Sequence, residues 1–181
     1  MRSKYKKYIF LIIILFCNSA VSQTAEEFST KTAFMVKMSY FINWPESSIL
    51  NKDNSTFIIC IEGSPKYFTS LEDWATTGKI KKRPVTLKYI NGDISELSSC
   101  NILFITSNHN LSSYLDIARE EKILTISDNP GNAQRGVIIN FFNVKNKLRF
   151  EINIDEAKSL GFKISPRLLK LATIITSGDI K

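Results

Sequence analysis

Two of the three cysteines and the single histidine are the residues of this 181-residue sequence whose chemistry is easiest to name. Cys60 and Cys100 can form a disulfide or remain free thiols. His109 lies in a loop rich in Asn and Ser, so a histidine-based metal centre or triad would depend on it alone. The sequence has no nucleophile-elbow, phosphate-binding or dinucleotide-binding motif, and its carboxylates are not paired at catalytic spacing. We therefore expect no enzymatic activity, no metal and no cofactor.

Whether cysteines form a disulfide depends on the cellular compartment of the protein. The first 22 residues have the three parts of a secretory signal peptide. Four basic residues between positions 2 and 7 precede an unbroken apolar run over 9–16, and Ala20-Val21-Ser22 forms a cleavage-site pattern. The apolar run is shorter than the roughly 20 residues that span a bilayer, which disfavours an uncleaved anchor. We therefore predict that 1–22 is removed and that 23–181 is one exported, periplasmic domain.

The charge balance argues against a nucleic-acid partner. Four of the 24 basic residues and none of the 17 acidic residues lie in the predicted signal peptide, so the formal charge falls from +7 to +3 without that segment. No basic stripe interleaved with aromatic residues is present. A basic cluster at 79–83 leads into a predicted strand, and we interpret it as a solvated sheet edge.

Removal of the signal peptide would also remove Cys17, which leaves two cysteines in an exported chain. An even number in that setting favours a disulfide between Cys60 and Cys100 over two buried free thiols. Cys60 falls inside a predicted strand and Cys100 directly precedes another. The bridge therefore requires those two strands to be neighbours.

Hydrophobic patterns predict the elements that would position these residues. A wide apolar face indicates a helix over 25–43, which Trp44-Pro45 ends. Apolar, β-branched runs predict four strands, with two helices between them. The strands cover 56–61, 84–90, 101–106 and 123–127, and the helices cover 65–77 and 111–122. This order predicts an α/β fold, a single-domain sandwich with a mostly parallel central sheet and flanking helices.

The C-terminal third has a different pattern. Strands over 137–144 and 147–152 flank a two-residue turn, which predicts an antiparallel C-terminal hairpin. Asn153 and Glu156 have the spacing of a helix cap, so Asn153 is expected to end the strand and start a short helix.

A last helix is predicted to begin at Ser165-Pro166, with Ser as its N-cap and Pro at its first position. Five apolar residues would dock that helix on the sheet. They are Leu168, Leu169, Leu171, Ala172 and Ile175.

Polar side chains of the C-terminal segment are candidates for partner binding. Arg149, Glu151 and Asn153 alternate along one face of the returning strand, and Lys163 and Arg167 follow closely in sequence. Arginine is common at binding hot spots. This set can form the docking rim for a partner protein, or it can form an internal ion pair together with the helix cap.

A small-ligand site is the alternative. In open α/β sheets, ligands bind beyond the carboxyl ends of the strands. Those ends carry Ser64, Ser107, Ser127 and Asp128 in this sequence. The same small and polar residues are also typical of ordinary turns, so ligand binding and turn formation both remain open.

Five segments, in order, resemble the YfiR-like family of exported bacterial proteins over roughly residues 30–175. They are AFMVKMSYFINWP at 33–45, FIICIEG at 57–63, CNILFI at 100–105, LTISDNPGNAQRGVIINFF at 124–142 and FEINIDEAKSLGFKISPRLLKLA at 150–172. The resemblance implies a disulfide, because Cys60 and Cys100 match the family's paired cysteines. The segment from Glu151 to Arg167 matches the family's partner-contact region. Lys163 stands where a basic residue is expected, and Ser165 replaces a histidine.

The best-known YfiR-like proteins are periplasmic regulators that hold an inner-membrane GGDEF diguanylate cyclase inactive until an outer-membrane lipoprotein sequesters them. Those members also carry a second cysteine pair near the hairpin. Asp128 to Arg149 contains no cysteine here, so a redox response linked to that pair is not expected.

The resemblance implies a periplasmic protein that binds and represses an inner-membrane signalling protein, most directly a diguanylate cyclase, and so lowers cyclic di-GMP output and biofilm formation. The alternative is a small-molecule-binding protein that works with a sensor kinase or an outer-membrane receptor. The broad apolar face of 25–43 also leaves a homodimer open.

Overall fold

The computed structural model describes residues 27–52, 56–107 and 109–176. The predicted signal peptide lies outside these residues. Within them, no helix combines the length and the apolar character needed to cross a bilayer.

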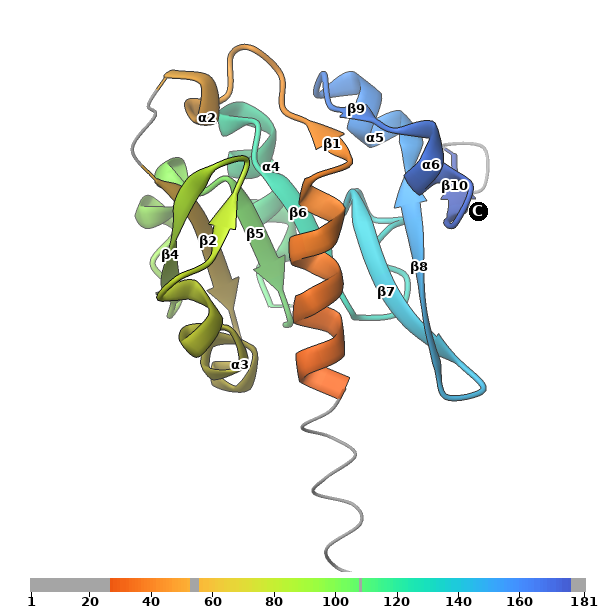
Figure 1. The fold of residues 1–181 in the computed structure, drawn as a ribbon. Coiled ribbons are helices and arrows are strands. Elements are labelled where there is room, and N and C mark those ends of the chain that lie inside the picture. Colours follow the sequence, from red (N-terminus) through yellow and green to blue (C-terminus); the bar gives the residue numbers. More distant parts are fainter. Residues whose placement is uncertain (1–26, 53–55, 108, 177–181) are drawn as a thin grey trace, which may run out of the picture.

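An eight-stranded sheet with the order β10-β8-β7-β6-β5-β2-β4-β3 forms the centre of the molecule (Figure 1). Its middle is parallel, as predicted. β2 (Phe57–Glu62) pairs with β4 (Arg83–Ile90) on one side and with β5 (Ile102–Ile105) on the other. β6 (Leu124–Ser127) follows β5 in parallel. These strands are apolar almost throughout because both faces of the sheet are covered.

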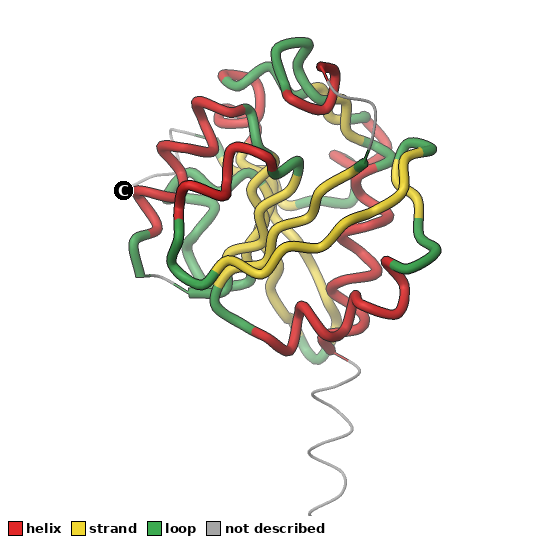
Figure 2. Tube along the Cα trace, turned by 90° about the vertical axis from the view of Figure 1, so that its left-hand side faces the viewer, coloured by secondary structure: helices red, strands yellow, loops and turns green. Residues whose placement is uncertain are grey.

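Helices cover both faces of the sheet (Figures 1 and 2). The N-terminal helix over 27–39 and α3 (Pro65–Ala75) share one core with Ile59, Ile61 and Phe104. The 3-10 helix η1 (Ile94–Ser99) and α4 (Leu111–Glu121) share a second core on the opposite face, which contains the alternate side chains of β2 and β5. The predicted sandwich with flanking helices is confirmed.

The cysteines lie in this second core. Cys60 and Cys100 form a disulfide with their Cα atoms 5.8 Å apart, and the two residues are 0% and 1% exposed. Cys60 lies opposite Leu103 of β5, the strand that begins just after Cys100. The neighbouring strands required for the bridge are therefore present, and the predicted disulfide is confirmed.

The C-terminal hairpin is also confirmed. β7 (Ile139–Val144) and β8 (Lys147–Asn153) pair antiparallel around Lys145 and Asn146. Both turn residues have positive φ, 49° and 60°, which matches the twist of a two-residue hairpin. β7 pairs in parallel with β6, so the hairpin extends the central sheet.

The predicted helix over 25–43 ends too late. Helical structure stops at residue 39, and Ile42–Asn43 forms a short strand, β1. β1 pairs antiparallel with β9 (Lys163–Ile164) near the C-terminus. Since each strand has only two residues, neither carries a periodic signal in the sequence.

The predicted last helix is wrong beyond its first turn. α6 covers Pro166–Leu169 only, and Thr173–Ile175 forms β10, which pairs in parallel with β8. Thr173 to Ile175 are all β-branched residues, which favour strands. Leu171, expected to dock on the sheet, is 69% exposed. β10 also gives β8 a second partner, so β8 is not left as an open edge.

Three further short elements were not predicted. They are α2 (Ile49–Lys52), β3 (Lys79–Ile80) and the 3-10 helix η1. The short helix expected after Asn153 is confirmed as α5 (Ile154–Ser159). β3 pairs antiparallel with β4, so the basic cluster at 79–83 forms a hairpin at the edge of the sheet, as interpreted.

Candidate partner-binding surface

The pairing of β1 with β9 joins the end of the N-terminal helix to the C-terminal segment. Asn43 lies opposite Lys163 in this ladder, and the Ser165 backbone N–H donates to the carbonyl oxygen of Phe41 at 2.8 Å. Arg167 follows in the first turn of α6. We call Tyr40, Phe41, Lys163 and Arg167 the β1–β9 surface.

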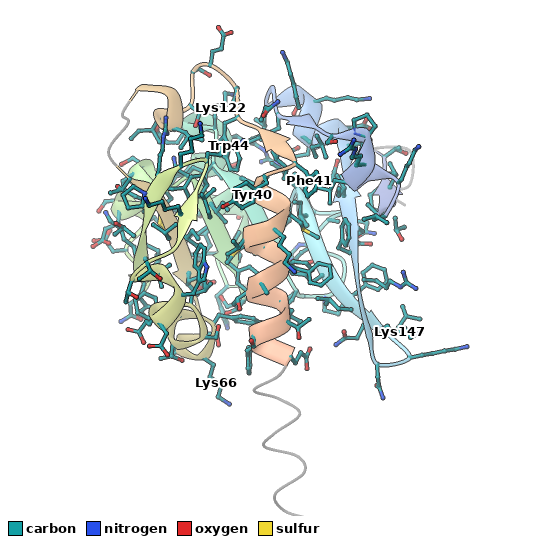
Figure 3. The ribbon with its side chains drawn as sticks, in the orientation of Figure 1. Tyr40, Phe41, Trp44, Lys66, Lys122 and Lys147 are labelled. Carbon is teal, nitrogen blue, oxygen red and sulfur yellow. A yellow bond between two sulfur atoms is a disulfide. The ribbon has the colours of Figure 1, made fainter. Side chains whose placement is uncertain are left out.

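The β1–β9 surface combines exposed aromatic side chains with exposed basic ones. Tyr40 is 53% exposed and Phe41 is 41% exposed, and both lie at the end of the N-terminal helix beside Trp44 (Figure 3). Lys163 and Arg167 are also exposed. Aromatic residues and arginine are enriched in the cores of protein interfaces. This composition is therefore typical of a protein-binding patch.

Further exposed apolar side chains lie on the neighbouring elements. Leu171, 69% exposed, follows α6, and Ile174 in β10 is 40% exposed. Phe34 is 38% exposed and lies on the N-terminal helix, seven residues before Phe41. Single exposed apolar residues are ordinary, but several on adjoining elements indicate a contact surface.

Trp44 anchors β1 beneath this surface. Its ring is 7% exposed, packs edge-on against Phe57 and Phe162, and donates its indole N–H to the carbonyl oxygen of Asn101 at 3.1 Å. The Lys81 ammonium lies 5.5 Å from the centre of the Trp44 ring. Burial lowers the pKa of Lys81, and the nearby charge of Arg83 lowers it further. These contacts fix the Trp44 side chain, which directly follows β1, in the core.

The structure divides the predicted partner-binding set. Lys163 and Arg167 lie on the β1–β9 surface, whereas Arg149 is exposed on the β7–β8 hairpin opposite Phe142. Arg149 precedes the end of β8 by four residues, or about 13 Å along the strand. β8 therefore does not place Arg149 next to Lys163 and Arg167.

Asn153 is used inside the fold. It is 5% exposed, its side-chain oxygen accepts from the Glu156 N–H at 2.9 Å, and its amide donates to the carbonyl oxygen of Ala133 at 2.8 Å. The expected helix cap is confirmed. Glu156 also pairs with Arg119 at 2.7 Å, and that hydrogen bond raises the pKa of the Arg119 guanidinium. Asn153 therefore positions α5, and both its side-chain oxygen and its amide nitrogen bond within the fold.

Glu151, the remaining member of the set, is half-buried and accepts from the side-chain amide of Asn140 at 3.1 Å. It lines a cavity beside β7.

The residues proposed for a small ligand at the strand ends bond mainly to the protein itself. The Ser107 hydroxyl donates to Glu62 at 2.8 Å. Ser127 is fully buried, and its hydroxyl oxygen accepts from the Asn132 side chain at 2.9 Å. Ser64 directly precedes α3 and forms no side-chain cap hydrogen bond. Turn formation accounts for most of this set, whereas Asp128 belongs to a charged network.

That network was not predicted. The Lys31 ammonium lies 2.8 Å from carboxylate oxygens of both Asp128 and Glu27, and the Tyr67 hydroxyl donates to Asp128. Burial by itself lowers the pKa of Lys31, but the hydrogen bonds to Asp128 and Glu27 raise it overall. Burial and the bond to Asp128 raise the pKa of Tyr67. The i,i+4 spacing of Glu27 and Lys31 was the one available sequence signal.

No group of three or more metal-ligating side chains occurs within the part of the chain that the structure describes.

The sequence of this chain matches one known protein family. The family model described as YfiR/HmsC-like matches residues 28–173, which is most of the chain. No curated protein matches the sequence significantly. The chain therefore belongs to the YfiR/HmsC-like family, as the sequence resemblance implied.

Proposed function

We propose that this member of the YfiR/HmsC-like family is a periplasmic regulator that binds the periplasmic part of an inner-membrane signalling protein and represses it. A diguanylate cyclase is the proposed target, so that binding lowers cyclic di-GMP output. Family membership supports a regulatory role and the periplasmic location. The absence of a catalytic motif in the sequence agrees with regulation by contact.

The observation that carries this proposal is the β1–β9 surface. It joins the segment that carries Phe41, 41% exposed, to the segment that carries Lys163 and Arg167. Tyr40, 53% exposed, adjoins Phe41 in the chain, and its hydroxyl donates to the carbonyl oxygen of Lys79. An exposed aromatic buried on binding contributes apolar area, and adjacent cations select a partner with acidic side chains. The matching segment from Glu151 to Arg167 is also the one for which the family resemblance implies partner contact.

Site-specific photocrosslinking tests the identity of the partner. A photoreactive phenylalanine analogue replaces Phe41 in the secreted protein, and a second version carries it at Lys66, on α3 at the other end of the molecule (Figure 3). Adducts from the position of Phe41 are expected to contain an inner-membrane protein with a GGDEF output domain. Adducts with the same protein from both positions would show that capture does not depend on this surface. Absence of any inner-membrane adduct would contradict the proposal.

Charge reversal tests the binding surface. Lys163→Glu with Arg167→Glu should weaken binding to the isolated periplasmic domain of the captured protein by about 10-fold or more, since cations at an interface rim or core contribute about 1–2 kcal/mol each. Lys66→Glu with Lys147→Glu makes the same charge change at exposed sites elsewhere and should leave affinity unchanged. If both double variants fold and bind with equal affinity, the β1–β9 surface does not bind the partner.

A further inference from the structure

Two basic segments that lie far apart in the sequence meet at strand β1. The tip of the β3–β4 hairpin carries Lys81, whose ammonium lies 3.5 Å from the side-chain oxygen of Asn43. In the β1–β9 ladder, Asn43 lies directly opposite Lys163, and both residues are exposed. Side chains of directly opposite residues point to the same face of a strand pair. The side chains of Lys81 and Lys163 therefore both lie beside that of Asn43.

The surface around β1 carries an excess of positive charge. The segments 79–83 and 157–170 each contain four basic residues and no acidic residue, and Glu46 is the one acidic residue in 40–50. Neither Lys81 nor Lys163 forms an ion pair within residues 27–52, 56–107 and 109–176. Cations that gather on one surface without counter-charges repel each other and attract an anion.

The position of Lys81 is set by its turn and by Trp44. Lys81 and Lys82 form the two-residue turn of the hairpin with positive φ, 51° and 69°. Asn and Gly are preferred in such a turn, so turn geometry does not account for two lysines. The Lys81 side chain is half-buried, with its ammonium 5.5 Å from the centre of the Trp44 ring. Burial and the charge of Arg83 lower the pKa of Lys81, and an anion beside the ammonium would stabilise its charged form.

The donors around Asn43 fit a carboxylate. Because Oδ1 of Asn43 faces the Lys81 ammonium, the Nδ2 of the same amide can donate to a bound acceptor. Lys81 and Lys163 add two charged donors. A carboxylate only accepts hydrogen bonds, and those from charged donors are the stronger ones. An anionic membrane presents many phosphates to a broad cationic face, whereas a few donors around one side chain match a single acidic residue.

We propose that Asn43, Lys81 and Lys163 form a carboxylate-binding subsite that receives an Asp or Glu side chain of the partner's periplasmic domain. The subsite extends the β1–β9 surface to the β3–β4 hairpin and selects partners that carry an acidic residue at the matching position. It rests on the proposed function, because the carboxylate belongs to the partner protein.

Calorimetric titration with the isolated periplasmic domain of the protein captured through Phe41 tests this subsite. Lys81→Gln removes the charge and should weaken binding by about 10-fold, because a charge-assisted hydrogen bond is lost. Lys81→Arg keeps the charge and should bind within about 3-fold of the wild type. If Lys81→Arg bound as weakly as Lys81→Gln, Lys81 would act through its packing on Trp44, and the proposal would be overturned.

The partner side of the contact gives a second test. Each exposed acidic residue of the partner domain is changed to its amide, Asp to Asn or Glu to Gln. One such change should make the wild type and Lys81→Gln bind equally, since the carboxylate that distinguishes them is gone. If Lys81→Gln remained weaker than the wild type against every amide variant, no carboxylate would occupy the subsite.

Lys145→Gln is the matched control. Lys145 occupies the same first position of a left-handed two-residue turn, in the β7–β8 hairpin, and is exposed. This variant should bind the partner domain like the wild type. Equal weakening by Lys81→Gln and Lys145→Gln would show nonspecific charge attraction and overturn the proposal.

Two further outcomes separate the subsite from its alternatives. If Lys81→Gln lost binding to phosphatidylglycerol vesicles but bound the partner domain like the wild type, the basic residues would serve a lipid surface instead. Unchanged binding of Lys81→Gln to a domain that the wild type binds would overturn the subsite alone. A folded wild type that does not bind the domain would overturn the proposed function and the subsite with it.

Discussion

The ammonium of Lys31 and the carboxylate of Asp128 lie 2.8 Å apart, although 97 residues separate them in sequence. Their side chains are only 9% and 15% exposed. The pair connects the N-terminal helix to the end of β6, and the same side chains line the cavity beside β7. One buried ion pair therefore links the N-terminal helix to the sheet, in addition to the hydrophobic core that the two share.

Loss of this ion pair should destabilise the protein. Lys31→Met removes the cation and leaves the Asp128 carboxylate partly buried without its counter-charge, at an expected cost of about 3 kcal/mol in the free energy of unfolding. Urea unfolding measures this cost. Lys37→Met, at an exposed position of the same helix, should change stability by less than about 0.5 kcal/mol. Similar effects of both changes would show that the ion pair does not anchor the helix.

Stability should also fall at alkaline pH. The raised pKa values of Tyr67 and Lys31 mean that both groups keep their protons in the folded state when they would lose them in the unfolded chain. Their contribution is complete below the unfolded pKa values, about 10 for tyrosine and about 10.4 for lysine, and decreases as the pH rises beyond them.

Urea unfolding between about pH 8 and about pH 11 measures this dependence. Tyr67→Phe removes the titrating hydroxyl and should make the alkaline decrease shallower, while it costs about 1 kcal/mol at neutral pH through the lost bond to Asp128. An unchanged alkaline slope in Tyr67→Phe would contradict the role assigned to that hydroxyl.

The disulfide should stabilise the fold without acting as an accessible redox switch. Replacement of Cys60 and Cys100 by Ser opens a loop with a sequence separation of 40 residues, and the chain-entropy model gives a loss of about 4 kcal/mol. Because both cysteines are at most 1% exposed, a thiol reagent should reduce the bond only when the protein opens. Mass spectrometry after mild reduction checks this. Rapid reduction of fully folded protein would contradict a purely structural role.

Asn153 should matter for stability more than for direct partner contact. Asn153→Ala removes the cap of α5 and the bond to Ala133, and should cost about 2 kcal/mol in urea unfolding. Arg149→Ala, at an exposed position of the same strand, should leave stability within about 0.5 kcal/mol. A fully stable Asn153→Ala protein that fails to bind its partner would instead place Asn153 in the interface.

The features that follow from local sequence were predictable. The central strands are apolar almost throughout because they are buried on both faces, and the Lys145-Asn146 turn sets the β7–β8 hairpin. The Asn153 cap depends on residues three positions apart. Cys60 lies within β2 and Cys100 comes shortly before the neighbouring strand β5, so their pairing was also predictable from the sequence.

Features that join distant segments of the chain arise only in the folded protein. β1 and β9 have two residues each, too few for a periodic pattern, and they pair across more than a hundred residues of chain. β10 adopts an extended conformation because β8 offers an unpaired edge. The ion pair between Lys31 and Asp128 forms only after the sheet has assembled, and so does the site in which Oδ1 of Asn140 has no hydrogen-bond partner. Local patterns in the sequence indicated the family, the central strands and the disulfide. Long-range packing determined which side chains reach the surface, since pairing partners far apart in the chain leave no local pattern.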